Sequence, residues 1–351
     1  MKKYITIYGF GLVGEHVANQ LLSCGFEIPL IIDKHKAGQF YRGIPIVSLG
    51  AAADIGILDQ SDCLIALHNH YVDLDELRKV LIIAGVRQVY SIVSFHRQVH
   101  PISVPRGYWL EEGFEVDQHR REIESFLSLL YDETSRNLVT DVIRYRTFGN
   151  ITECPKPSPK DEYTPVDLPG YRGPLRVLDC GAFTGVALRK FRKAGYEIQS
   201  FAAFEPDLLN FETLVKEDFG AAEGIYFPVA TWSSNVHKRF NSNRAMASSI
   251  SDEGEALVPC VRVDDTLLGF APNLIKLDVE GAEFETLIGM EETIRKYRPN
   301  LCISAYHTAH DIFRLGLLVA SWDLGYKFHV RLHEQNTFGL VVYGRQQALE
   351  V

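Results

Sequence analysis

The sequence predicts an α/β protein with two domains, each built on a mainly parallel sheet. Strand-like and helix-like runs alternate in both halves of the chain, which is the pattern of parallel strands joined by helices. In each half, one apolar strand leads through a glycine-rich turn into a helix, at Gly9 and again at Gly181. The length of 351 residues also suggests about two domains.

The composition is that of an ordinary globular protein and argues against several other classes. Hydrophobic residues make up 46% and charged residues 23%, which is sufficient for two ordinary cores. The net charge of −9 and the lack of a basic run argue against a nucleic-acid partner. The six cysteines are scattered without a C-x-x-C pair, and Glu15 interrupts the first apolar stretch, so neither a disulfide framework nor a signal peptide is indicated. No stretch approaches a membrane span. We expect a cytoplasmic protein.

Residues 1–100 are predicted to form a small Rossmann-like domain of the nucleotide-binding type. Expected strands cover residues 4–8, 29–32, 63–67 and 88–93, and expected helices run from the glycine turn to Leu22 and over residues 73–84. Each connection between these strands is long enough for a helix, so a parallel sheet is the natural arrangement.

The turn of this first domain matches the dinucleotide fingerprint. Gly9, Gly11 and Gly14 have the spacing G-x-G-x-x-G, and Asp33 ends the next strand at the distance expected for a ribose-binding acid. NAD or a nucleotide sugar would suit such a turn. However, this half lacks a Tyr-x-x-x-Lys catalytic pair, and a purely structural role for the turn remains equally open.

Residues 101–170 lack the alternation of strands and helices that both predicted domains show. Two helical stretches, 116–131 and 135–145, precede a tract that contains Pro155, Pro157, Pro159, Pro165 and Pro169. Such a tract is typical of a linker or an ordered lid. Tyr163 within it could stack on a sugar or a cofactor, or anchor the segment to the surface.

The second domain is predicted for residues 171–351. A strand ends at Asp179 and is followed by the turn with Gly181 and Gly185, then by a helix over residues 186–194. Glycines there let a ligand approach the backbone. The next strand ends at Glu205, about 20 residues after the turn, where an acid can bind ribose hydroxyls. We therefore expect a cofactor at this edge.

Two further strands end in candidate catalytic side chains. The run before Asp278 and the run before His307 are consecutive, and the carboxyl ends of neighbouring parallel strands meet at one sheet edge. Lys276 shares a strand face with Asp278 and could hold its carboxylate charged. The chain closes with runs at 326–332 and 337–343 around a polar turn, which predicts a β-hairpin.

Six motifs in this half also carry a resemblance to a known family. They are V-L-D-C-G-A at 177–182, F-E-P at 204–206, S-S-I at 248–250, I-K-L-D-V-E-G-A-E at 275–283, R-P at 298–299 and S-A-Y-H at 304–307. Together they resemble the FkbM-type methyltransferases, over roughly residues 132–343. The resemblance implies a class I, S-adenosylmethionine-dependent enzyme with a Rossmann-like sheet. It also implies that members act as O-methyltransferases on sugars, glycolipids or natural products, which would suit polysaccharide biosynthesis. By this resemblance the cofactor-binding residues would be Asp179, Gly181, Ala182, Gly185, Glu205 and Pro206.

Methyl transfer to a hydroxyl requires a proton acceptor. His307, assisted by Asp278, would serve as that base, although a hydrogen-bonded histidine at a strand end is an equal alternative. Glu280 and Glu283 could simply offset a helix dipole. A magnesium or zinc site of Asp278, Glu280, His307 and His333 has no diagnostic spacing, so we expect no metal.

The sequence therefore favours an S-adenosylmethionine-dependent O-methyltransferase. Its acceptor would be a saccharide-containing or other small hydroxylated molecule. The alternatives are an NAD-linked oxidoreductase or a nucleotide-sugar-binding sensor that uses the first domain. Whether the chain forms a homo-oligomer is left open.

Overall fold

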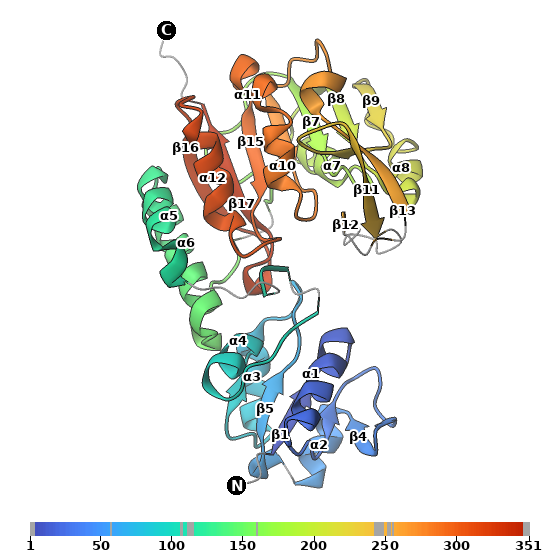
Figure 1. Cartoon of the computed structure of the whole chain (residues 1–351), viewed down its shortest axis with the longest axis vertical. Helices are drawn as coiled ribbons and strands as arrows, with labels where there is room; N and C mark the ends of the chain where they lie inside the picture. The colour runs from blue at the N-terminus through green and yellow to red at the C-terminus, as the bar shows by residue number, and fades with distance from the viewer. Residues whose placement is uncertain are drawn as a thin grey trace. The chain divides into compact units, whose positions relative to one another are not determined.

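A computed structural model describes residues 4–56, 58–105, 108–110, 116–158, 161–241, 249–250, 254 and 256–346. Pro159 and Ser248, which the sequence analysis singled out, lie outside the described residues. The chain forms two compact units (Figure 1). Unit 1 comprises Met1–Gln118, Asn137–Pro157 and Glu334–Phe338, and unit 2 comprises His119–Arg136, Ser158–His333 and Gly339–Val351.

Unit 1 contains a six-stranded sheet in the order β3-β4-β2-β1-β5-β6. Its strands are β1 (Ile5–Tyr8), β2 (Ile31–Ile32), β3 (Phe40–Tyr41), β4 (Ile44–Val47), β5 (Asp62–Ile65) and β6 (Val89–Tyr90). All neighbours pair in parallel except β3 and β4. This confirms a parallel α/β plan for the first half of the chain.

The helices of this half are α1 (Leu12–Ser23), α2 (Leu49–Ile55), α3 (Leu74–Ile83) and α4 (Ile92–Gln98). Short 3₁₀ turns occur at Leu58–Gln60, Tyr108–Leu110, Ile151–Glu153 and Gln335–Thr337. The predicted strand over residues 88–93 was wrong in its second half. Ser91 and Ser94 form a reciprocal capping box that starts α4 at Ile92, so the strand ends at Tyr90.

The predicted linker begins with two long helices, α5 (Val116–Leu129) and α6 (Glu133–Phe148). Residues 101–170 are divided between the two units, with 119–136 and 158–170 in unit 2. Within unit 2, α5 packs on α12 through Phe126, whose ring lies where a side chain at Gly316 would otherwise stand. The predicted domain boundaries near residues 100 and 170 separate parts that should fold independently, and they stay predictions.

Unit 2 contains a seven-stranded sheet in the order β16-β17-β15-β14-β7-β8-β9. Its strands are β7 (Leu175–Cys180), β8 (Ile198–Phe204), β9 (Glu223–Phe227), β14 (Leu274–Leu277), β15 (Asn300–Ser304), β16 (Lys327–Leu332) and β17 (Leu340–Arg345). The first five are parallel, whereas β17 is antiparallel to both β15 and β16. The predicted closing hairpin is confirmed, and its last strand lies between β15 and β16.

The helices of unit 2 that follow its strands are α7 (Val186–Lys193), α8 (Leu208–Leu214), α9 (Val263–Thr266), α10 (Glu283–Ile288), α11 (Glu291–Tyr297) and α12 (Asp311–Ser321). His310 occupies the N-cap position of α12 but makes no side-chain cap bond, and Asp311 instead accepts the backbone N–H of Thr308 at 2.9 Å. Among the described residues, no helix is both long enough and apolar enough to cross a membrane.

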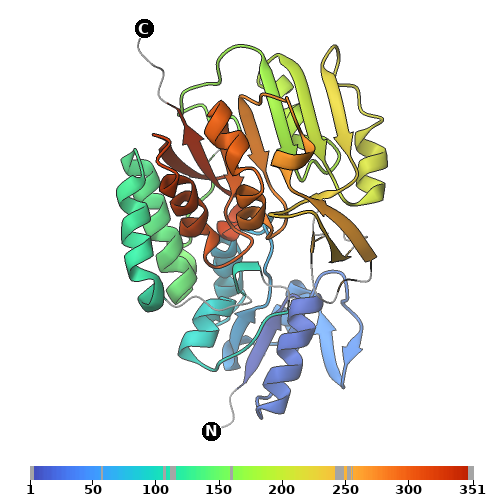
Figure 2. The ribbon, with the colours of Figure 1, turned by 45° about the horizontal axis from the view of Figure 1, so that its top comes forward.

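A second, four-stranded sheet of unit 2 was not predicted. It has the order β10-β13-β11-β12, with β10 (Ala230–Thr231), β11 (Val236–Asn241), β12 (Ser249–Ile250) and β13 (Ala256–Val261). Figure 2 shows its longer strands as a small sheet distinct from the seven-stranded one. In the chain it comes between β9 and β14. Strands β8 and β9 extend the seven-stranded sheet on one side of β7, and β14 then pairs on the other side of β7. That reversal point, between β7 and β14, is where open α/β sheets bind ligands.

Candidate active site

The glycine turn after β7 lies against the end of β14. Gly181 has φ of +74°, and a Cβ there would stand 1.8 Å from the carbonyl oxygen of Asp278. The backbone N–H of Asp278 donates to the carbonyl oxygen of Cys180 at 3.1 Å, which continues the ladder past both strand ends. A glycine is therefore required at position 181, and the turn and Asp278 are fixed side by side.

Glu205, at the end of β8, is bonded to this turn. Its Oε2 accepts the backbone N–H of Phe183 at 2.8 Å, and its Oε1 accepts the N–H of Asp207 at 2.9 Å. Burial raises the pKa of Glu205 despite these bonds, and only 6% of the residue is exposed. The structure thus brings Glu205 to the glycine turn, as the sequence predicted.

Asp179 is buried behind the turn and forms an ion pair. Its Oδ1 lies 3.2 Å from Nζ of Lys276, and that ammonium also donates to the carbonyl oxygen of Gly181 at 2.5 Å. Burial raises the pKa of Asp179, while the Lys276 charge opposes that shift. The cationic group that Asp179 faces in this structure is therefore a lysine of the neighbouring strand.

Asp278 is the more accessible carboxylate, with 23% of its side chain exposed. Its Oδ2 accepts the hydroxyl of Tyr163 at 3.1 Å and lies 3.8 Å from Nζ of Lys276. Burial acts to raise the pKa of Asp278, but the charges of Lys276 and His307 outweigh it and hold the pKa below its ordinary value. Asp278 is therefore ionised at neutral pH.

His307 lies between three carboxylates. Its Nε2 is 3.6 Å from Asp278 Oδ1 and 3.6 Å from Glu280 Oε1, and its Nδ1 is 2.9 Å from Glu283 Oε1. Burial acts to lower the pKa of His307, but Glu283 and Glu280 raise it well above the ordinary value. The ring therefore carries a proton at neutral pH.

Comparisons with known proteins agree with this geometry. Residues 179–328 match the model of the methyltransferase FkbM domain. This segment is similar to the methyltransferase FkbM domain over 150 of the 351 residues of the chain. In the crystal structure of methyltransferase FkbM from Methylobacillus flagellatus KT, 90% of the chain aligns with 98% of this one, at a TM-score of 0.75 and 19% identity. That likeness shows the fold.

A second solved structure, the CurJ carbon methyltransferase, aligns with 69% of this chain and 64% of its own, at 11% identity. Its TM-score of 0.28 is too low to support an argument. No curated protein matches the sequence. The match to the FkbM domain and the shared fold together support a methyltransferase.

Three of the four candidate metal ligands of the methyltransferase domain lie together. The ligand atoms of Asp278, Glu280 and His307 are within 4.8 Å of one another and could hold a metal ion. His333 lies outside this group, because its Nε2 is 2.8 Å from the hydroxyl of Tyr343 and its Nδ1 is 3.7 Å from Asp161. Burial lowers the pKa of His333 to about 4.

The contacts of two residues of the site were not predicted from the sequence. Glu283, which was attributed mainly to a helix dipole, is fully buried and accepts the N–H groups of Val279 and Gly281 at 2.8 and 3.0 Å while it faces His307. Tyr163 binds Asp278, although 115 positions separate them. The sequence indicated for Tyr163 an aromatic residue in a proline-rich tract, which could stack on a ligand or anchor the segment, and this pattern does not indicate its partner.

The glycine turn of unit 1 has a different surrounding from that of the methyltransferase domain. Asp33 accepts the N–H groups of Phe10, His35 and Lys36 at 2.7, 2.8 and 3.0 Å. Burial acts to raise the pKa of Asp33, but these bonds lower it overall.

The glycines of that turn are explained by packing in two cases. A Cβ at Gly9 would stand 2.3 Å from Leu67, and one at Gly14 would stand 2.0 Å from the carbonyl oxygen of Gly9. No described atom lies within 4 Å of a Cβ at Gly11. The match to the FkbM domain covers residues 179–328, which all belong to unit 2. No comparison supports NAD or a nucleotide sugar at the turn of unit 1.

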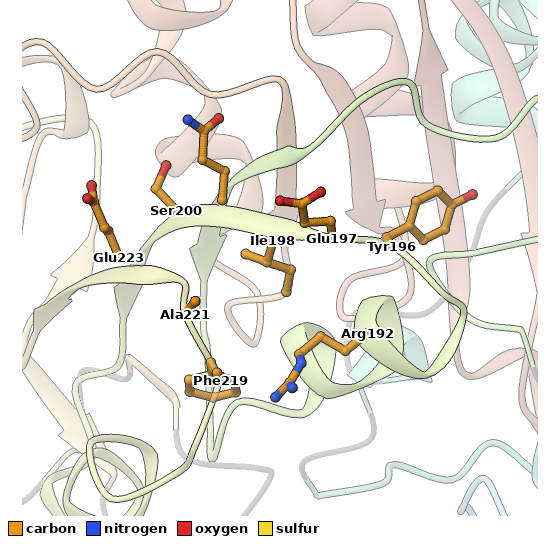
Figure 3. A pocket seen from close by; sticks show the side chains of 10 residues that line it. Arg192, Tyr196, Glu197, Ile198, Ser200, Phe219, Ala221 and Glu223 are labelled. Carbon is orange, nitrogen blue, oxygen red and sulfur yellow. The ribbon is translucent and has the colours of Figure 1, made fainter.

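A surface hollow of the methyltransferase domain lies at the opposite sheet edge. Figure 3 shows it beside the amino ends of β8 and β9, with Arg192, Tyr196, Ser200 and Glu223 among its lining residues. It contains none of the predicted site residues. Gly181, Glu205 and Asp278 lie instead at the carboxyl ends of β7, β8 and β14.

Proposed function

We propose that this methyltransferase takes its methyl group from S-adenosylmethionine and transfers it to a hydroxyl group. The acceptor would be a saccharide-containing or other small hydroxylated molecule, and a role in polysaccharide biosynthesis in the cytoplasm belongs to the same proposal. The observation that carries it is the meeting of Asp278 and His307 beside the Glu205-bound glycine turn.

The glycine turn suits the nucleoside of the methyl donor. Glu205 is held by one backbone N–H on each oxygen, and a carboxylate has further lone pairs that can accept ribose hydroxyls. Ala182, Gly185 and Pro206 belong to the same two connections and would border the nucleoside. Asp179 would act through Lys276, since its carboxylate is buried against that ammonium.

The carboxylates at the strand ends suit a positively charged sulfonium. Asp278 and Glu280 have 23% and 20% of their side chains exposed, so both can face a ligand. Opposite charges attract strongly in a partly desolvated site. A methyl donor with a sulfonium centre would be drawn to this edge.

The chemistry would be a direct in-line displacement. The acceptor oxygen forms a bond to the methyl carbon as the bond from that carbon to sulfur breaks, and the hydroxyl proton passes to the protein. Asp278 is the ionised, accessible group that can take this proton, and His307 would stabilise the carboxylate from behind. Orientation of the two reactants supplies the rest of the acceleration.

Labelled S-adenosylmethionine tests this function directly. A panel of nucleotide sugars, glycolipids and hydroxylated natural products is incubated with wild-type protein, Asp278→Asn and the exposed control Asp323→Asn. We expect transfer by the wild type and the control, and a loss of at least about a hundredfold for Asp278→Asn, because a positioned base contributes that much. A chelator should have little effect. Full turnover by Asp278→Asn would contradict the assigned role, and failure of the wild type to bind the donor would contradict the proposed function.

A further inference from the structure

Tyr163 reaches the catalytic edge from a segment outside the methyltransferase sheet. It lies in the proline-rich tract before β7, yet only 3% of it is exposed. Its hydroxyl lies 3.1 Å from Asp278 Oδ2. A buried tyrosine hydroxyl requires a polar partner, and for Tyr163 the partner is the carboxylate that we assign as the proton acceptor.

Two other tyrosines fix the backbone of Tyr163. Its N–H donates to the hydroxyl of Tyr343 at 3.0 Å, and its carbonyl oxygen accepts the hydroxyl of Tyr171. The Tyr343 hydroxyl also lies 2.8 Å from Nε2 of His333. Because burial lowers the pKa of His333 to about 4, the ring is neutral at physiological pH and its Nε2 can accept the proton of Tyr343. The position of Tyr163 is therefore determined by bonded groups on both sides.

Ion pairs hold the neighbouring residues of the same segment. Glu162 accepts a hydrogen bond from Nζ of Lys190, and Asp167 lies 2.6 Å from a guanidinium nitrogen of Arg331. The backbone at Tyr163 has φ of +69°, a left-handed conformation that a side chain other than glycine seldom adopts. Packing and pairing around the segment must supply the free energy for that conformation.

The two oxygens of Asp278 have different surroundings. Oδ2 accepts the hydroxyl of Tyr163 and is the oxygen nearer to Lys276, whereas Oδ1 is buried and lies 3.6 Å from His307 Nε2. A carboxylate that has a different neighbour at each oxygen keeps a defined orientation.

We propose that Tyr163 is a positioning residue of the active site: by binding Oδ2 of Asp278, it fixes the orientation of the carboxylate that receives the proton of the acceptor hydroxyl. This inference rests on the proposed function. During transfer the oxygen–carbon bond forms, the sulfur–carbon bond breaks and the proton moves to the carboxylate of Asp278. The proton of Tyr163 stays in place, because burial raises the pKa of its hydroxyl well above the ordinary value.

Tyr163→Phe removes the hydroxyl and keeps the ring. The control is Tyr326→Phe, which removes a hydroxyl bonded at 2.6 Å to the carbonyl oxygen of Pro299, at the amino end of β15. We expect Tyr163→Phe to lower kcat about tenfold or more, the scale of a hydrogen bond to a charged group. The KM of the acceptor and the affinity for S-adenosylmethionine should stay within about threefold of wild type. The control should resemble wild type, and an unchanged kcat in Tyr163→Phe would overturn the proposal.

Carboxyl NMR of protein labelled at aspartate Cγ tests the positioning without an acceptor. The signal of Asp278 is assigned from its loss in Asp278→Asn. The charged or titratable groups that face Asp278 are Lys276 on its strand, Asp179 on β7, His307 after β15, Glu280 in its own loop, and Glu162 with Tyr163 in the preceding segment. Loss of the Tyr163 hydroxyl removes a donor to the ionised form, so Asp278 should titrate at higher pH in Tyr163→Phe and unchanged in Tyr326→Phe.

The two experiments separate this inference from the proposed function. An unchanged titration of Asp278 in Tyr163→Phe overturns the positioning role, whatever the acceptor is. A shifted titration in a protein that does not bind S-adenosylmethionine supports the positioning role and overturns the proposed function. If Tyr163→Phe does not fold, the ring-carbon signal of Tyr163 is compared between wild type and Asp278→Asn. That signal should move when its partner becomes an amide, and a signal that stays in place overturns the inference.

Discussion

The two glycine turns of this protein make similar hydrogen bonds to the strand that follows them in the chain, but they differ in the residues on the next strand of the sheet. In unit 1, the N–H of Gly9 donates to Ile32 at 2.8 Å, and the N–H of Phe10 donates to the carboxylate of Asp33 at 2.7 Å. In unit 2, the N–H of Gly181 donates to Phe204 at 3.0 Å, and the N–H of Phe183 donates to Glu205 at 2.8 Å. In both cases an acid after the second strand fixes the turn after the first.

The two turns differ at the next strand along the sheet. Ala66 follows β5 and donates its N–H to Tyr8, whereas Asp278 follows β14 and donates its N–H to Cys180. One strand further, Ser91 caps a helix in unit 1, while His307 lies among carboxylates in unit 2. A glycine turn with its acid is thus common to both units. The ionisable groups on the adjacent strand ends distinguish the turn of unit 2, which we propose as the methyltransferase site.

The largest expected effect concerns the glycine that contacts Asp278. Gly181→Ala would place a Cβ 1.8 Å from a backbone oxygen at a positive φ, which no side-chain movement can relieve. We expect a loss of stability of about 3 kcal/mol or more, and loss of donor binding. Urea unfolding and calorimetry measure the two effects.

Gly11→Ala in unit 1 is the matched control. A Cβ at position 11 would contact no described residue, and the φ of −83° suits any residue. Only the N-cap of α1 changes, so we expect the free energy of unfolding to fall by about 1 kcal/mol or less. If Gly181→Ala and Gly11→Ala destabilised the protein equally, the close contact of Gly181 with Asp278 would not explain the need for glycine at position 181.

A smaller effect is expected from the charge of His307. Its pKa in the folded protein is raised by Glu283 and Glu280 against the effect of burial, so its ion pairs stabilise the fold fully at pH values below the ordinary histidine pKa. That stabilisation is lost as the pH rises through the folded value. The unfolding temperature of wild type should therefore fall between neutral and alkaline pH more than that of His307→Gln. Parallel pH dependences in the two proteins would contradict a raised pKa.

The strand ends of both sheets were predictable because apolar runs stop abruptly at polar residues. Asp33, Glu205, Asp278 and His307 all follow such runs, and parallel strands bring their carboxyl ends to one edge. The protonation of His307 was not predictable, since it depends on side-chain distances to Glu283. The ordinary pKa of histidine was the only guide, and it left a base and a hydrogen-bonded strand-end residue equally open.

Other features depend on contacts that no local pattern records. Tyr163 binds Asp278 directly across 115 positions, and the hydroxyl of Tyr343 holds the backbone of Tyr163. The four-stranded sheet includes two strands of only two residues, β10 and β12, which are too short for a periodic signal. Lys276 was expected to pair with Asp278, but it lies closer to Asp179, at 3.2 Å against 3.8 Å.

Calorimetric titration with S-adenosylmethionine tests the central claim most directly, namely that the turn of unit 2 is the cofactor site and that of unit 1 is not. The proteins to compare are wild type, Glu205→Ala and Asp33→Ala. We expect one donor to bind per chain, with an affinity about tenfold or more lower in Glu205→Ala, because charged hydrogen bonds to ribose are lost, and unchanged in Asp33→Ala. Unchanged affinity in Glu205→Ala, or loss of binding in Asp33→Ala, would contradict the account.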